Sequence, residues 1–252
     1  MAGHSQFKNI MHRKGVQDKR KAKLFTKIIK EVAVAARASG IDPSSNPRLR
    51  SAITTAKGLN VPKSRLDAVL KRLSDNTPGE CYEEIRYEGY GPGGIALILD
   101  ILTDNRNRTA SEIRSTFTKY GGILGETDSV TYLFTRMGYI EYPRSIAPFN
   151  TILESAIDAE TLECEEINDC YEITCSFDAL HNVRTFLEPI YGEPREAKII
   201  WSPIKATAVA LDFESATKIL KLVESLEDND DVQSVTGNYA IPEDVMKRLY
   251  GG

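Results

Sequence analysis

The chain has 252 residues, of which 41% are hydrophobic and 27% charged, a composition typical of globular proteins with room for one large domain or two to three small ones. Its apolar runs are short, as at residues 95–99, so we predict no membrane-spanning helix. The net charge of −4 is unevenly distributed. Residues 1–79 contain 17 Lys and Arg against 5 Asp and Glu, a net of +12, which leaves a net of −16 for the remainder.

The leading segment, residues 2–23, is the most basic part of the chain, and Asp18 is the only acid among the first thirty residues. A targeting peptide is one interpretation and a solvated tail is another. The segment has no apolar core of the kind a secretory signal needs, and its apolar residues form no sustained helical stripe. We therefore predict a cytoplasmic protein whose basic segment attracts polyanions. Docking of this basic part on the acidic remainder is compatible with that prediction.

The cysteines and histidines predict neither a disulfide framework nor a metal site. No C-x-x-C occurs, three of the cysteines fall in predicted strands, and no histidine pair has ligand spacing. We expect reduced, mostly buried thiols and no cofactor. The residues concerned are Cys81, Cys164, Cys170, Cys175, His4, His12 and His181.

Three helices are predicted before residue 79. Apolar residues recur at helical spacing over residues 24–39, and Gly40 ends that pattern. Asn46 as N-cap and Pro47 at the first helical position begin a second helix, which Gly58 ends. Pro62 is expected to begin a third in the same way. Residues 1–79 are thus predicted to form a basic arm and a small helical domain, followed by the linker DNTPGE.

The remainder is predicted to be α+β. Residues 80–136 have the pattern β-β-α-β, with SVTYLFTR (129–136) as the last strand. Residues 137–203 have the order βαββαβ of a ferredoxin-like unit. Residues 204–252 add a strand from PIKATAVALD, a helix, a further strand and a short final helix. We therefore predict a discontinuous middle domain, 80–136 plus 204–252, into which a ferredoxin-like domain, 137–203, is inserted.

The glycine-rich stretch GYGPGG (89–94) resembles a phosphate loop only in composition. A Walker or Rossmann loop connects a strand to a helix, whereas this stretch connects two predicted strands. A hairpin turn is the favoured interpretation. A backbone contact to phosphate or to a partner, and more remotely a hydrolase site, are the alternatives.

The segment LTDNRNRTASEIR (102–114) is a dense polar cluster where a strand leads into a helix. Asn107 or Thr109 is predicted to cap this helix, and Asp104 to brace Arg106 or Arg108. The functional alternative is that the two arginines donate to phosphate or carboxylate.

The basic module is the predicted nucleic-acid interface, because cations bind phosphates while Phe7 and His12 can stack on bases. No catalytic constellation occurs, so we predict no enzymatic activity. The candidate nucleic-acid-binding residues are His4, Phe7, Lys8, His12, Arg13, Lys14, Lys19, Arg20, Lys21, Lys23, Lys27, Arg48, Arg50, Lys57, Lys63, Arg65, Arg106 and Arg108. Lys71 and Arg72 add to the positive charge of the same module.

Several blocks together resemble the YebC/PmpR family of bacterial proteins over essentially the whole chain. They are AGHSQFKNIMHRKGVQDKRKAKLFTKIIKEVAVAAR, DPSSNPRLRSAI, YEGYGPGGIA, TDNRNRTASEIRSTFTKYGGILGE and SVTYLFTRMGYI. Three departures stand out: Gln6-Phe7 replaces the usual Lys-Trp, Asp128 replaces a glycine, and the helix after Pro62 is atypical.

The resemblance implies three domains, a cytoplasmic location, and neither cofactor nor catalysis. It also implies one of two roles: a DNA-binding transcriptional regulator, or a ribosome-associated translation factor that binds RNA and assists the synthesis of proline-rich sequences. The expected partner is thus DNA or ribosomal RNA, with neither a membrane nor a small-molecule substrate.

Overall fold

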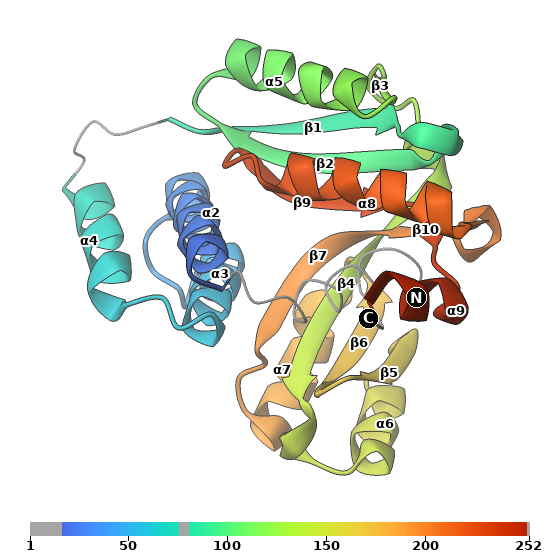
Figure 1. Cartoon of the computed structure of the whole chain (residues 1–252). Coiled ribbons are helices and arrows are strands. Elements are labelled where there is room, and N and C mark those ends of the chain that lie inside the picture. Colours follow the sequence, from blue (N-terminus) through green and yellow to red (C-terminus); the bar gives the residue numbers. More distant parts are fainter. Residues whose placement is uncertain (1–16, 76–80, 251–252) are drawn as a thin grey trace. The chain divides into compact units, whose positions relative to one another are not determined.

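The computed structural model describes residues 17–75 and 81–250 and shows an α+β protein, as predicted (Figure 1). The chain divides into two compact units, which are described separately. Unit 1 comprises residues 1–23, 80–135 and 201–252, and unit 2 comprises residues 24–79 and 136–200. The predicted limits of the three domains remain a prediction.

The three predicted helices of the basic module are present. They are α2 (Gln17–Ser39), α3 (Pro47–Gly58) and α4 (Lys63–Ser74). The Asn46 side chain accepts from the Leu49 amide at 3.0 Å and donates to the carbonyls of Ala35 and Gly40. One side chain thus caps α3 and ties it to the end of α2. Pro62 differs from the prediction, because it occupies the N-cap position and the helix begins at Lys63.

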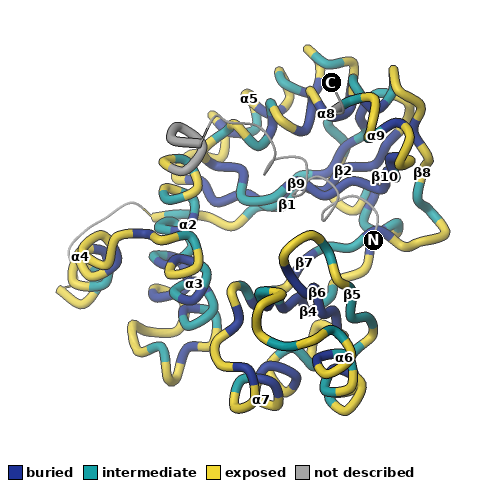
Figure 2. Tube along the Cα trace, turned by 60° about the horizontal axis from the view of Figure 1, so that its bottom comes forward, coloured by how far each residue is buried: buried dark blue, intermediate teal, exposed yellow. Residues whose placement is uncertain are grey.

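The apolar sides of these helices meet in one cluster that includes Val32, Ala35, Leu49, Ala56 and Leu66. All five side chains are buried, and the burial of this apolar surface stabilises the packing of the three helices. The charged residues lie on the outer sides. Figure 2 shows the resulting contrast along α4, where buried and exposed positions alternate with the helical turn.

The sheet of unit 1 has the strand order β3-β1-β2-β9, with antiparallel neighbours throughout. Leu97 and Leu99 of β2 pack on one face against Phe117 and Ile219 from two helices. The other face of β2 packs through Ile98 and its neighbours against Val130 and Phe134. The central strand is therefore buried on both faces. These elements are β1 (Glu83–Tyr90), β2 (Ala96–Thr103), β3 (Ile123–Leu124), β9 (Val232–Gly237), α5 (Arg106–Lys119) and α8 (Phe213–Glu227).

Two strand predictions were wrong in part. Within 129–136 the chain forms a short 3₁₀ turn, η2 (Thr131–Leu133), and strand β4 begins only at Phe134. The amides of Val130 and Thr131 donate to a buried carboxylate instead of to a neighbouring strand.

Within 203–212 a second 3₁₀ turn, η4 (Lys205–Thr207), precedes the two-residue strand β8 (Val209–Ala210). The Thr207 amide and hydroxyl both donate to the Ile204 carbonyl, which curls the chain at this point. Strand β8 pairs in parallel with β10 (Tyr239–Ala240), and α9 (Glu243–Tyr250) follows.

The insert is ferredoxin-like, as predicted. Its elements follow in the order β4-α6-β5-β6-α7-β7, and its sheet has the order β5-β6-β4-β7. Ile140, Tyr142 and Ile173 form the core on the face that carries the two helices. The bounds are β4 (Phe134–Pro143), α6 (Phe149–Asp158), β5 (Glu163–Ile167), β6 (Cys170–Ser176), α7 (Leu180–Tyr191) and β7 (Glu196–Pro203).

Candidate nucleic-acid interface

Part of the predicted interface lies outside the described residues: His4, Phe7, Lys8, His12, Arg13 and Lys14. Lys19, Arg20 and Lys21 fall in the first turns of α2, where the structure describes the backbone alone. Their roles stay predictions. One structural fact bears on them, because the helix already includes residue 17, and the basic leading segment is thus partly helical.

Several predicted cations of α2 and α3 are engaged by acids. Arg48 forms a forked ion pair with Glu31, with its Nε and Nη2 at 2.7 and 3.1 Å from the two carboxylate oxygens. Lys57 pairs with Glu193 at 3.1 Å, and Lys23 with Asp228 at 2.9 Å. A paired cation must exchange one anion for another when it binds phosphate, so these three positions gain less from a nucleic acid. The other two predicted positions, Lys27 and Arg50, are partly buried.

Helix α4 presents four exposed cations of the module. Lys63 and Arg65 in its first turns are exposed, as are Lys71 and Arg72 in its last turn. Among the described residues, no acidic group lies within ion-pair distance of these four. Arg65 and Arg72 are seven residues apart and so share one side of the helix. The helix therefore carries four cations available to an external anion.

The polar segment after β2 is built differently from the prediction. Asn105, and not Asn107 or Thr109, caps α5, since its side chain accepts from the Arg108 amide at 3.0 Å. Asn107 is exposed, whereas Thr109 is buried and lies one turn inside the helix.

Asp231 is the centre of this segment, with its side chain only 6% exposed. Its Oδ2 accepts from the hydroxyls of Thr109 at 2.7 Å and Thr103 at 3.1 Å, and from Arg108 Nη2 at 2.7 Å. Arg108 also donates to Asp104 at 2.8 Å. Hydrogen bonds to these two carboxylates, Asp231 foremost, raise the pKa of Arg108 above its ordinary value. The predicted brace by Asp104 thus falls on Arg108.

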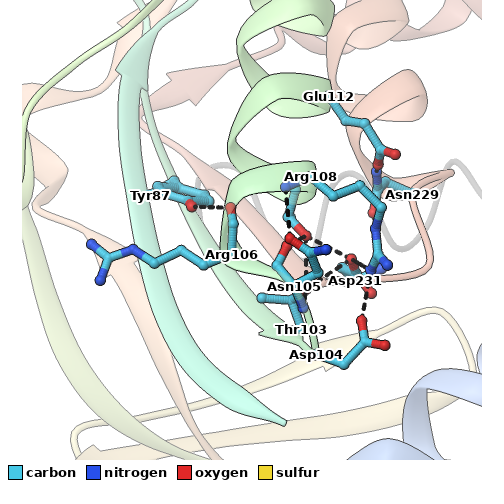
Figure 3. Close-up of polar contacts among 10 residues, drawn as sticks. Tyr87, Thr103, Asp104, Asn105, Arg106, Arg108, Glu112, Asn229 and Asp231 are labelled. Carbon is cyan, nitrogen blue, oxygen red and sulfur yellow. Dashed lines mark hydrogen bonds and ion pairs between the residues drawn. The ribbon is translucent and has the colours of Figure 1, made fainter.

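Arg106 lies on the other side of the same turn. Figure 3 shows its side chain directed away from Asp231, while its carbonyl accepts from the Tyr87 hydroxyl at 3.5 Å. The residue is exposed, and its guanidinium has no ion-pair partner within the described part of the chain. Of the two predicted arginines, Arg106 is the one available to a ligand and Arg108 is held by the fold.

The GYGPGG stretch is a turn between β1 and β2, in agreement with the favoured prediction. Gly93 and Gly94 have φ values of +77° and +75°, in the region that favours glycine. At Gly91 the reason for glycine is space: a Cβ there would lie 2.5 Å from Ile219 Cδ1 on α8.

Sequence reasoning missed Glu88, a buried carboxylate on β1. Its two oxygens accept from the amides of Asp128, Val130 and Thr131, from the Thr131 hydroxyl, and from Arg86 Nε at 2.9 Å. Burial acts to raise the pKa of Glu88, but these bonds together outweigh it and hold the pKa below its ordinary value. In the sequence Glu88 is one of three acids of this strand, with Glu83 and Glu84, and no pattern marks it as buried.

Comparison with known proteins accounts for nearly the whole chain. Residues 5–76 match the family model described as the TACO1/YebC protein N-terminal domain, and residues 82–239 match the one for the TACO1/YebC second and third domain. Among the described residues, no helix is long and apolar enough to cross a membrane.

Two curated relatives from Rickettsia are similar over nearly their full length. One from Rickettsia bellii, named "Probable transcriptional regulatory protein", is 49% identical over 100% of this chain and 99% of its own. One with a similar name from Rickettsia typhi is 50% identical over 98% of each chain. The crystal structure of a conserved hypothetical protein from Aquifex aeolicus is 42% identical and has a TM-score of 0.82, covering 90% of this chain and 93% of that one.

Proposed function

Because this chain belongs to the TACO1/YebC family, we propose that it is a non-enzymatic regulator of gene expression that binds DNA through its basic helical module and controls transcription. The observation that carries the proposal is the exposed basic surface of α4, formed by Lys63, Arg65, Lys71 and Arg72. The names of the curated relatives support the transcriptional role. A cytoplasmic location follows from the same role.

Phosphate binding is the chemistry that this surface fits. Four cations on one twelve-residue helix present a high local charge, and their side chains do not have to leave an acidic partner before binding. Neutralising phosphates releases condensed counterions, so each phosphate contact contributes to affinity and to its salt dependence. The basic arm adds Lys8, Arg13 and Lys14 to this charge.

The cations of α4 can bind either phosphates or guanine edges, whereas the helix contains none of the Asn or Gln side chains that read adenine in the major groove. We propose that they contact the phosphate backbone and hold the protein on the duplex with little sequence preference.

The test replaces Arg65, Lys71 and Arg72 by Gln together and measures duplex DNA affinity over a range of salt concentrations. For each phosphate that the variant no longer neutralises, the log–log salt dependence should flatten by about 0.9, so we expect a change of about 2 to 3. The reduction in affinity should be the same for DNA of different sequences.

The matched control is the triple change of Lys218, Lys221 and Lys247 to Gln, which removes the same charge from exposed sites on α8 and α9. It should leave the salt dependence unchanged. If both triple variants weaken binding equally, net charge alone is responsible and the proposed interface is wrong.

The second candidate, a ribosome-associated factor that binds RNA, uses the same phosphate chemistry, which the cations of α4 supply equally well. Crosslinking of the protein in cells, followed by sequencing of the bound nucleic acid, separates the two. Promoter DNA is the expected result. A footprint on ribosomal RNA would replace the transcriptional role by the translational one.

A further inference from the structure

The face of the insert's sheet that carries no helix contains an unusual row of acids. Glu165 on β5 pairs in register with Glu172 on β6, which in turn pairs with Glu141 on β4. Residues paired across strands point to the same face, so three carboxylates lie side by side. Glu172 in the middle is only 2% exposed. Like charges directly opposite one another destabilise a sheet, and burial increases the cost.

Cys170 adds a thiol to this row. It lies two residues before Glu172 on β6 and therefore on the same face, and it is 9% exposed. The Cys170 sulfur and one oxygen each from Glu141 and Glu172 lie within 4.8 Å of one another. We propose that Glu141, Cys170 and Glu172 form a binding site for one thiophilic divalent cation of the Zn²⁺ type.

The donor set selects this class of cation. Mg²⁺ and Ca²⁺ take oxygen ligands, whereas a thiolate with two carboxylates suits Zn²⁺, which binds sulfur at about 2.3 Å and oxygen at about 2.0–2.2 Å. A tetrahedral ion with such bonds holds its ligand atoms about 3.5 Å apart. The three atoms lie up to 4.8 Å apart without an ion, so a bound ion would draw them closer, chiefly by movement of Glu172 and Cys170. Cys170 Sγ, which donates to the Ile167 carbonyl at 3.3 Å, would give up this weak bond.

Neighbouring side chains orient the proposed ligands and leave a hydrogen-bonding group without a partner beside them. The Tyr139 hydroxyl donates to Glu141 Oε2 at 2.9 Å, and Tyr139 is itself buried, so it fixes the orientation of that carboxylate. Thr174, on the neighbouring rung of the same face, is 1% exposed, and its hydroxyl has no hydrogen-bond partner. A buried hydroxyl without a partner is typical of a place where a water or an ion completes the structure.

The site depends on strand pairing, which explains why the cysteine and histidine spacings predicted no metal. Glu141 and Glu172 are separated by an intervening helix and strand, and their proximity follows only from the register of β4 with β6. Cys170 and Glu172 alone do not form a recognisable metal motif in the sequence.

The test titrates the reduced full-length protein with Co²⁺, whose thiolate complexes have a charge-transfer absorption band, and then adds Zn²⁺. We expect the band to saturate at one equivalent and to disappear as Zn²⁺ displaces Co²⁺. Cys170→Ser should abolish the band, whereas Cys81→Ser, which changes an exposed cysteine elsewhere, should retain it. No nucleic acid is present, so the result is independent of the proposed function.

A second pair of variants tests the supporting hydroxyl. Tyr139→Phe should weaken Zn²⁺ binding by about 10-fold or more, as changes to the partners of metal ligands do. Tyr142→Phe is the matched control, because Tyr142 lies on the helix-covered face of the same strand and its hydroxyl donates to the Gly192 carbonyl. Circular dichroism checks that each variant is folded.

Four results would overturn the metal site. The first is the absence of a thiolate band in the folded wild-type protein. The second is a band that survives Cys170→Ser, and the third is equal weakening by Tyr139→Phe and Tyr142→Phe. Metal binding that depends on the glutamates but not on Cys170 also contradicts it, because that pattern indicates cation attraction by charge alone.

Discussion

Glu88 organises the loop between β3 and β4 at the scale of single residues. Five donors converge on its two oxygens, and one of the donating amides belongs to Asp128, whose φ of +64° lies in the left-handed region. Asp128 is held there by this bond and by Arg86 Nη2 at 2.6 Å. Glu88 thus holds Asp128 in a left-handed conformation that glycine adopts without strain. Glycine is the residue that the YebC/PmpR family usually has at this position.

Glu88→Gln should lower the free energy of unfolding by about 1–3 kcal/mol, because one acceptor oxygen becomes an NH₂ group that faces donors. Urea unfolding at neutral pH measures the change. Glu126→Gln, at an exposed position of the same loop, is the control and should have little effect.

The pH dependence follows from the lowered pKa of Glu88. A depressed carboxyl pKa contributes stability that is complete above the ordinary value of 4.5 and is lost as pH falls through the folded-state pKa. Unfolding midpoints of the wild type should therefore decrease below pH 4.5 more steeply than those of Glu88→Gln. Parallel curves would show that Glu88 does not contribute.

Substitution of Arg108 should change the stability of the fold, whereas substitution of Arg106 should not. Arg108→Gln leaves the buried Asp231 without its guanidinium partner and should lower the urea unfolding midpoint. Arg106→Gln should change stability by less than about 0.5 kcal/mol and, if Arg106 contacts phosphate, weaken DNA binding. Equal destabilisation by both changes would contradict the distinction.

At the scale of a single element, the turn between β1 and β2 requires neighbouring glycines for different reasons. Gly91 has a φ of −80°, which any residue adopts, but its neighbours on α8 leave no room for a side chain. Gly93 has open space around its missing Cβ and a positive φ. Space decides the first position and backbone conformation the second.

Asn and Ala substitutions should therefore rank oppositely at the two positions. At Gly93, Asn should cost less than Ala, because Asn tolerates the left-handed region in which other residues lose about 1–2 kcal/mol. At Gly91, Ala should cost about 1–3 kcal/mol through overpacking and Asn more. Thermal unfolding of the four variants gives the ranking, and an identical order at both positions would refute it.

Local signals predicted the elements well where the residues alone determine the conformation. Asn46, Pro47 and Gly40 mark the ends of their helices by chemistry confined to a few neighbouring residues. The strand predicted at 129–136 failed because a distant residue, Glu88, binds the amides that a strand would have used. Asn105 was missed as a cap because Asn107 and Thr109 are equally good capping residues in the sequence.

At the scale of the whole molecule, the charge asymmetry points to the basic module as the candidate interface, and this assignment stays a prediction. It could not distinguish Arg48, which is paired with Glu31, from Arg65, which is not, because the pairing depends on how two helices pack. The proximity of Glu141 and Glu172 to Cys170 could not be predicted for the same reason. Burial and strand register are properties of the fold and leave only a faint pattern in the sequence.

Deletion of residues 2–16 is the sharpest test of the basic arm, because it removes Lys8, Arg13 and Lys14 and leaves α2 intact from its first residue. DNA affinity should fall to the same extent for every sequence, and the log–log salt dependence should flatten by up to about 2.7. Binding assays at several salt concentrations measure both. Unchanged affinity would exclude the arm from the interface.

The pairing of β4 with β7 has a consequence for how the gene can be edited. The Arg195 amide donates to the Glu141 carbonyl and the Ile204 amide to the Leu133 carbonyl, so the two strands run antiparallel where the chain enters and leaves the insert. Residues 135 and 201 therefore lie nearly opposite one another, at about the 4.8 Å spacing of neighbouring strands. A linker of a few residues could bridge that distance. The two ends of the ferredoxin-like segment are thus adjacent. The segment could therefore be excised, or exchanged for a homologous one, without moving the rest of the chain apart.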